Sequence, residues 1–324
     1  MAILDDNFDF EQDGKTYNLY NLPDGFVIKG NVYLSYKELT ELPDFSKVTV
    51  ERDFYCNNNK LTTLQGAPQE VGGGFYCGDN QLTTLEGAPQ KVGGVFRCVN
   101  NQLTSLEGAP QEVGGDFVCY YNKLTSLTGA PREVGGGFSC YNNQLTSLQG
   151  VPQKVGGKFD CGYNQLTSLE GAPQEVGGNF WCNNNQLTSL TGAPQKVGGY
   201  FSCENNQLTS LQGAPRVVGG DFNCDKNDNL FSLFGLPQMS GDKKIYCDDD
   251  LKERYNCPKA ENEDGNYYID YKDLIESAKY QSELSLYKIL QKKHEERAQN
   301  DTARKEKLKA GFEAFMKMQT EERE

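Results

Sequence analysis

Eleven cysteines are the residues of this chain with the clearest capacity for chemistry. Nine of them recur every 21 residues, at Cys56, Cys77, Cys98, Cys119, Cys140, Cys161, Cys182, Cys203 and Cys224. Thiolates can bind zinc or act as nucleophiles, and paired thiols can form disulfides. Zinc sites need CxxC pairs or histidines, but the sequence has no CxxC pair and one histidine, His294. Cysteines repeated at one place in every coil point the same way, which suits a disulfide torsion poorly. We therefore expect a column of buried thiols that fills the interior, with no metal and no cofactor.

Catalytic motifs are missing from the rest of the sequence. A single histidine leaves no Ser-His-Asp triad. Asp249 and Asp250 form an acidic pair, but a carboxylate catalyst needs a cleft, and we expect none at that end of the chain. The sequence therefore predicts a protein that is not an enzyme.

The 21-residue spacing of the cysteines is the period of a sequence repeat. The fold of this repeat positions the other candidate residues. In the copy around Cys119, Phe117 and Cys119 alternate inward on a short strand, as the two-residue period of strands requires. Asn122, Leu124 and Leu127 follow, and a Gly-Ala-Pro turn brings the chain around. A period of this length predicts one structural unit stacked many times around a continuous core.

This unit resembles the leucine-rich-repeat family, whose pattern is LxxLxLxxNxLxxL. Phe117 and Cys119 take the places of two strand leucines, and Asn122 takes the place of the asparagine. The resemblance implies a solenoid with short parallel strands on one side and irregular or 3-10 structure on the return side. It also implies that the asparagines are buried and bonded to the backbone of adjacent coils. The repeat sequence is similar to the short-period repeats of tailed-bacteriophage and bacterial proteins. Function does not follow, because members of the family bind many unrelated things.

The sequence divides into three parts. Residues 1–30 are expected to form an N-terminal cap, residues 31–257 the solenoid, and residues 258–324 a C-terminal helical segment. A helix is expected from Ile269 to about Arg297, sealing the last coil. A second amphipathic piece is expected to dock on a partner or on a second copy of the chain, which would give a homo-oligomer. Its apolar stripe consists of Leu308, Phe312, Phe315 and Met316.

The outward-facing strand positions vary strongly from copy to copy, whereas the inward positions barely change. They hold the only tryptophan and several tyrosines, and aromatic residues beside Asn, Asp and Arg are typical of recognition surfaces. We expect this face to be the concave side and to bind a partner. The candidate residues are Tyr55, Tyr76, Arg97, Tyr120, Tyr121, Tyr141, Asp160, Tyr163, Trp181 and Tyr200.

Charge and hydropathy narrow the class of partner. The formal net charge of −13 argues against a nucleic-acid partner and favours a neutral or basic protein surface. No stretch approaches the roughly 18 apolar residues of a membrane span, and the N-terminus lacks the features of a signal peptide. We expect a cytoplasmic protein, in a host cytoplasm or a virion if it is phage-encoded.

The main functional prediction is a non-enzymatic protein-binding solenoid that binds a host or virion protein through its aromatic strand face. Carbohydrate recognition is an alternative, since aromatic rings with Asn and Asp neighbours can stack on and hydrogen-bond to sugars. A structural or assembly role through the C-terminal helices is a further alternative.

Overall fold

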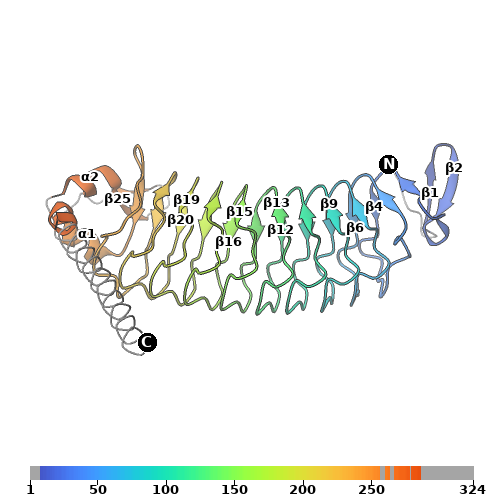
Figure 1. Cartoon of the computed structure of the whole chain (residues 1–324), viewed down its shortest axis with the longest axis horizontal. Coiled ribbons are helices and arrows are strands. Elements are labelled where there is room, and N and C mark those ends of the chain that lie inside the picture. The colour runs from blue at the N-terminus through green and yellow to red at the C-terminus, as the bar shows by residue number, and fades with distance from the viewer. Residues whose placement is uncertain (1–7, 256–259, 263–265, 278, 286–324) are drawn as a thin grey trace, which may run out of the picture.

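The structure is a computed structural model that describes residues 8–255, 260–262, 266–277 and 279–285. Short strands recur once or twice in every coil, and the coils stack along one axis (Figure 1). The predicted repeat solenoid is confirmed. Its inward residues are the ones that the repeat pattern indicated, because parallel in-register pairing places each residue beside its counterpart in the next coil.

The main sheet has 13 strands. All its parallel members except β23 start at the first inward residue of a coil, so phenylalanine pairs with phenylalanine along most of the stack. They are β4 (Val32–Tyr33), β6 (Phe54–Tyr55), β8 (Phe75–Tyr76), β10 (Phe96–Arg97), β12 (Phe117–Val118), β14 (Phe138–Ser139), β16 (Phe159–Asp160), β18 (Phe180–Trp181), β20 (Phe201–Ser202), β22 (Phe222–Asn223) and β23 (Lys244–Tyr246). The sheet ends in two antiparallel strands, β25 (Tyr267–Asp270) and β24 (Ala260–Glu261).

A second ladder of short parallel strands runs along the return side, where 3-10 structure was one of the expectations. Among the described residues, the one 3-10 helix is η1 (Leu19–Asn21), which lies before the coils. Six strands form one sheet: β3 (Val27–Ile28), β5 (Thr49–Val50), β7 (Glu70–Val71), β9 (Lys91–Val92), β11 (Glu112–Val113) and β13 (Glu133–Val134). Four form another: β15 (Lys154–Val155), β17 (Glu175–Val176), β19 (Lys196–Val197) and β21 (Val217–Val218).

Glycine explains why the return side can pair in this way. The coils approach so closely beside the second ladder that a Cβ on Gly93 would lie 2.1 Å from the carbonyl oxygen of Gly72. Only a residue without a side chain fits there. The recurring Val-Gly-Gly sequence therefore allows the backbones of adjacent coils to pair on the return side.

The core consists of stacked columns. The rings from Phe54 to Phe222 are fully buried, and their neighbouring centroids lie 5.2 to 5.6 Å apart. The cysteines from Cys56 to Cys247 are free thiols and are buried in the same core. Such columns bury apolar side chains in every coil, so stability grows with each repeat added.

The asparagine column ties adjacent coils together. Asn143 accepts a hydrogen bond from the Leu124 amide at 3.0 Å. Its amide nitrogen donates to the carbonyl oxygens of Cys119, Cys140 and Tyr141 at 3.0 to 3.3 Å. This is the arrangement that the leucine-rich-repeat resemblance implied.

The second ladder is interrupted between β13 and β15, which do not pair. Elsewhere, equivalent amides bond to the preceding coil, as Gln174 does to Gln153 at 2.8 Å and Gly177 does to Val155 at 3.0 Å. No such bond from Gln153 is among the described backbone hydrogen bonds. Val151 stands at this coil where seven other copies carry alanine, and it is buried. Its amide hydrogen bond to Leu148, within the same coil, is 3.5 Å long, against 3.0 Å at the equivalent Ala172, so we expect the larger side chain to displace this turn.

We expect amide hydrogen exchange to locate this break. The amides of Gln153 and Gly156 should exchange at least about tenfold faster than those of Gln174 and Gly177, since each lacks one inter-coil bond. The substitution Val151→Ala should restore their protection. Mass spectrometry or NMR can measure the rates, and equal protection at both pairs in the wild type would contradict the interpretation.

The two ends of the solenoid differ from its middle. An antiparallel hairpin of β1 (Asp9–Gln12) and β2 (Lys15–Asn18) precedes the coils. After them come α1 (Asp249–Tyr255), the β24–β25 pair, α2 (Tyr271–Glu276) and a helical stretch at 279–285. The expectation of a helix starting at Ile269 was wrong, because that residue pairs with Ile245 and extends the main sheet by one strand.

The stripe expected to dock on a partner, Leu308, Phe312, Phe315 and Met316, lies outside the described residues. So does the C-terminal part of the expected helix, beyond residue 285. Among the described helices, none is long and apolar enough to cross a membrane.

Candidate functional site

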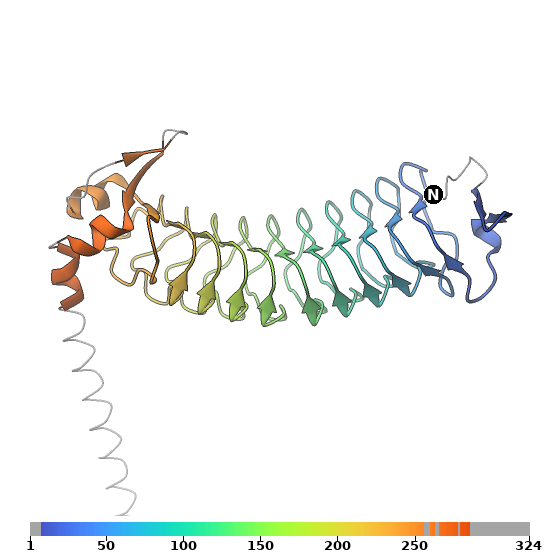
Figure 2. The same ribbon diagram turned by 90° about the horizontal axis from the view of Figure 1, so that it is seen from above.

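The outer surface of the main sheet is the candidate site, and it lies on the concave side of the molecule. Figure 2 shows the stacked coils bent into a bow, with the β24–β25 hairpin rising on its inner side. Asn262 and Tyr267 of this hairpin line the same cavity as Asn223 and Tyr246, which face outward from β22 and β23. The outward residues of the main sheet therefore share the inner side of the bow with the hairpin.

The N-terminal third of this face carries a stack of tyrosine rings. Tyr33, Tyr55 and Tyr76 lie nearly parallel, with centroids 5.2 and 4.7 Å apart. Tyr55 donates a hydrogen bond to Asp53 at 3.0 Å, and burial raises the pKa of its phenol to about 12. Sequence reasoning selected Tyr55 and Tyr76 but missed Tyr33, although Tyr33 follows Val32 as Tyr55 follows Phe54.

A second aromatic group lies at the middle of the face. The guanidinium group of Arg97 donates to the Tyr120 hydroxyl and lies 5.1 Å from the centroid of that ring. Tyr120, Tyr121 and Tyr141 contact one another with centroids 4.6 to 5.4 Å apart. The structure thus brings four of the candidate residues into one cluster.

Tyr121 and Tyr163 hold unfavourable backbone conformations. Each stands two residues after a cysteine, where φ is +53° for Tyr121 and +52° for Tyr163. Most copies place Asn or Asp there, which tolerate the left-handed region far better than an aromatic residue does. Both residues are about half exposed, at 48% and 55%, so burial of their rings does not offset the energy of the backbone strain. Strained residues of this kind gather at functional sites.

We expect Tyr121→Asn and Tyr163→Asn to raise the free energy of unfolding by about 0.5–1 kcal/mol each, because asparagine relieves the left-handed strain. Urea denaturation measures the change. Tyr120→Asn is the matched control, since that residue has no positive φ and its ring contacts Arg97. A loss of stability in the two test variants would show that the rings contribute more to packing than their exposure indicates.

A hollow of about 230 Å³ opens next to this cluster. It is lined by Tyr141, Lys158, Asp160, Tyr163, Trp181 and Asn183, so three further candidate residues meet Tyr141 there. Asp160 pairs with Trp181 across β16 and β18. Burial raises the pKa of the Asp160 carboxyl, and a hydrogen bond from the Gly162 amide and the charge of Lys158 oppose that rise.

Several outward residues serve the fold, which corrects the expectation that they are open for recognition. Val118, Ser139 and Ser202 face outward but are buried by larger neighbours. Asp53 and Asp116 each accept a hydrogen bond from a glycine amide of the next coil at 2.6 Å. These two carboxylates are therefore engaged by the backbone of the next coil.

Tyr200, the last candidate residue, lies apart from the others at a polar cavity of about 700 Å³ near the C-terminal end. Asp249 and Lys252 also line this cavity, and they form an ion pair at 3.1 Å. The expectation that no cleft lies near Asp249 was wrong, because the β24–β25 hairpin folds over the sheet and encloses one.

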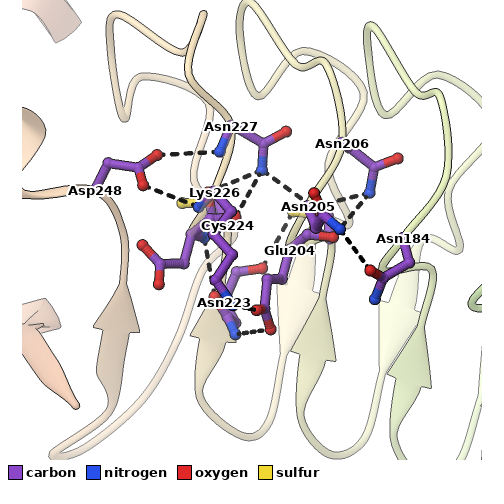
Figure 3. Close-up of polar contacts among 11 residues, drawn as sticks. Asn184, Glu204, Asn205, Asn206, Asn223, Cys224, Lys226, Asn227 and Asp248 are labelled. Atoms are coloured by element: carbon purple, nitrogen blue, oxygen red, sulfur yellow. Dashed lines mark hydrogen bonds and ion pairs between the residues drawn. The ribbon is translucent and has the colours of Figure 1, made fainter.

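Polar contacts fix the wall of this cavity (Figure 3). Lys226 forms an ion pair with Glu204 at 2.6 Å, and Asn223 donates to the other oxygen of Glu204 at 3.1 Å. The Asp248 carboxylate accepts the amides of Lys226 and Asn227 at 2.9 and 3.1 Å. Asp248 thus replaces the backbone partners that a further coil would have offered.

No protein-family model matches the chain, and no curated protein matches it. Among solved structures, the chain is similar to YopM from Yersinia enterocolitica WA-314, at 16% sequence identity and with a TM-score of 0.26. The match covers 67% of this chain and 65% of YopM, so the chain spans just under two thirds of that protein's length. The coils themselves establish the fold. It is a leucine-rich-repeat-like solenoid.

The buried cysteines of the solenoid have thiols of low reactivity. Burial raises the pKa of Cys98 to about 12 and places that of Cys119 well above its usual value. The thiolate, which is the reactive form, is therefore scarce at neutral pH. Among the described residues, no group of three or more His, Cys, Asp or Glu side chains could hold a metal ion.

We expect the ten described thiols to resist iodoacetamide in the native protein and to react once urea unfolds it, as low accessibility and raised pKa values require. Peptide mass spectrometry assigns each site. Rapid alkylation of Cys119 or Cys140 under native conditions would contradict the buried column.

Proposed function

We propose that this solenoid is a non-enzymatic scaffold that binds a protein partner through the concave face of its main sheet. The contact centres on the aromatic group around Tyr121, Tyr141, Tyr163 and Trp181. One observation carries the proposal: two half-exposed tyrosines occupy left-handed positions where most other copies carry asparagine or aspartate. Rigid aromatic side chains are the most common anchors of protein interfaces.

Charge supports a neutral or basic partner surface. The chain carries a formal net charge of −13, and like charges would repel a phosphate backbone. The ten described thiols are free, which suits a cytosol. We extend the proposal to a host or virion protein as the partner, on the likeness of the repeat wording to tailed-bacteriophage proteins.

A comparative capture experiment tests the proposal. Tagged wild-type chain and the variant Tyr121→Asn/Tyr163→Asn/Trp181→Ser are incubated with lysate from the cells that make the protein. The variant should recover at least about tenfold less of the partner, because aromatic anchors contribute about 1–2 kcal/mol or more each. The matched control is Lys91→Ser/Glu112→Ser/Lys154→Ser, which alters exposed residues of the return side. Equal recovery with all three proteins would refute the assignment of the face.

Carbohydrate recognition remains a second candidate on the strength of the hollow, where aromatic rings adjoin Asp160 and Asn183. A glycan array probed with the wild type and with Trp181→Ser examines it. Binding that disappears in the variant supports this candidate, and an array without signal removes it. The proposed assembly role of the C-terminal helices would depend on residues outside the described ranges.

A further inference from the structure

The hollow beside Trp181 lies between outward side chains of neighbouring coils, among them Tyr141 and Asn183. Gly162 stands in the column that holds Tyr141 in the preceding coil and Asn183 in the next. A Cβ on Gly162 would lie 3.0 Å from the Asn183 side-chain oxygen. Gly162 itself is buried, and the side chains of Tyr141, Tyr163, Trp181 and Asn183 line the hollow around it.

The one carboxylate in this hollow, Asp160, feels the charge of Lys158 but forms no ion pair with any of the described residues. It accepts a hydrogen bond from the Gly162 amide at 3.1 Å. Lys158, which also lines the hollow, is exposed. A part-buried negative charge among aromatic rings is the environment that attracts an organic cation, by an ion pair and by the negative faces of the rings.

We propose that this hollow binds the guanidinium group of an arginine side chain on the protein partner. The inference rests on the proposed function and names the chemistry of the contact. At about 230 Å³, the hollow is smaller than the roughly 300–1,000 Å³ of typical small-molecule sites and suits one long side chain. Arginine fits better than lysine, because its planar, weakly hydrated group stacks on aromatic faces.

Trp181 makes the hollow directly observable, since it is the only tryptophan of the chain. The full-length protein is titrated with the peptide acetyl-Gly-Arg-Gly-amide while tryptophan fluorescence is recorded. The same peptide with citrulline, the neutral isostere of arginine, is the ligand control. We expect a saturable change with the arginine peptide, which weakens as salt is added, and none with the citrulline peptide.

Three variants separate a binding role from a structural one. Asp160→Asn keeps an oxygen that can accept the Gly162 amide but removes the charge, and should weaken arginine binding about tenfold or more. Asp79→Asn is the charge-matched control on the same face, at a position where other copies carry asparagine, and should leave the affinity unchanged. Lys158→Ala removes a competing positive charge and should strengthen binding, which a damaged fold would not do.

Several results would overturn the proposal. They are an equal response to both peptides, no saturable change with either, or full affinity in Asp160→Asn. A monosaccharide that produces the saturable change in place of the arginine peptide would assign the hollow to carbohydrate instead. If the titration fails while partner capture still depends on the aromatic residues, the proposed function stands without this contact. If capture does not depend on the face, the proposed function itself is lost.

Discussion

Replacing Phe138 by alanine is expected to lower the free energy of unfolding by about 3–5 kcal/mol. The ring is fully buried and stacks between Phe117 and Phe159, with centroids 5.2 and 5.6 Å away. Removing it leaves a cavity in the middle of the column, and both neighbouring coils are held by inter-strand hydrogen bonds that limit their collapse. The loss therefore includes the transfer term and the cavity term together.

Urea denaturation followed by circular dichroism measures this change. Gln144→Ala is the control, because this side chain is exposed. It should alter stability by less than about 0.5 kcal/mol. Because coils unfold with their neighbours in repeat proteins, the variant can also broaden the transition. A Phe138→Ala protein as stable as the control would show that the phenylalanine column does not support the fold.

The second large effect is expected at the asparagine column. Asn206 is 8% exposed. It accepts the Leu187 amide at 3.0 Å and donates to the carbonyl oxygens of Cys182, Cys203 and Glu204 at 3.0 to 3.2 Å. Asn206→Ala leaves one amide and several carbonyls without this partner, so we expect a loss of about 2–4 kcal/mol.

Asn206→Asp distinguishes the two halves of the side chain. Aspartate keeps the acceptor for the Leu187 amide but offers no donor, and its charge would face carbonyl oxygens. It should therefore destabilise the protein at least as much as alanine does. Gln207→Ala changes the exposed neighbour and serves as the control. A stable Asn206→Asp protein would mean that the donated hydrogen bonds contribute little.

The inward columns could be predicted from the sequence because each coil repeats the same chemistry at the same place. Every copy has the same order of residues as Phe117, Cys119 and Asn122. Stacking in register therefore places each side chain beside its equivalent in the next coil. The second ladder was missed, although Val-Gly-Gly recurs in the sequence. Its signal is a close backbone approach, which becomes visible only when two coils lie side by side.

The candidate site could be predicted only as a set of columns. Val118 and Tyr121 both belong to the outward columns of one coil, but the structure buries Val118 and leaves Tyr121 exposed at 48%. Exposure on this face depends on the sizes of the neighbours in the coils before and after. Tyr33 was missed because its coil departs from the repeat, with Leu34 in the place of cysteine.

The sequence alone determined that this protein is a solenoid and which residues form its core, since a regular period imposes the same local structure on every coil. Only the tertiary structure decided how the outward residues combine. It brought Tyr141, Trp181 and Asn183 together around one hollow, assigned Asp53 to the backbone of the next coil and broke the return ladder between β13 and β15. The reason is that these features arise from differences between adjacent coils, and stacking brings together residues that lie 21 positions apart.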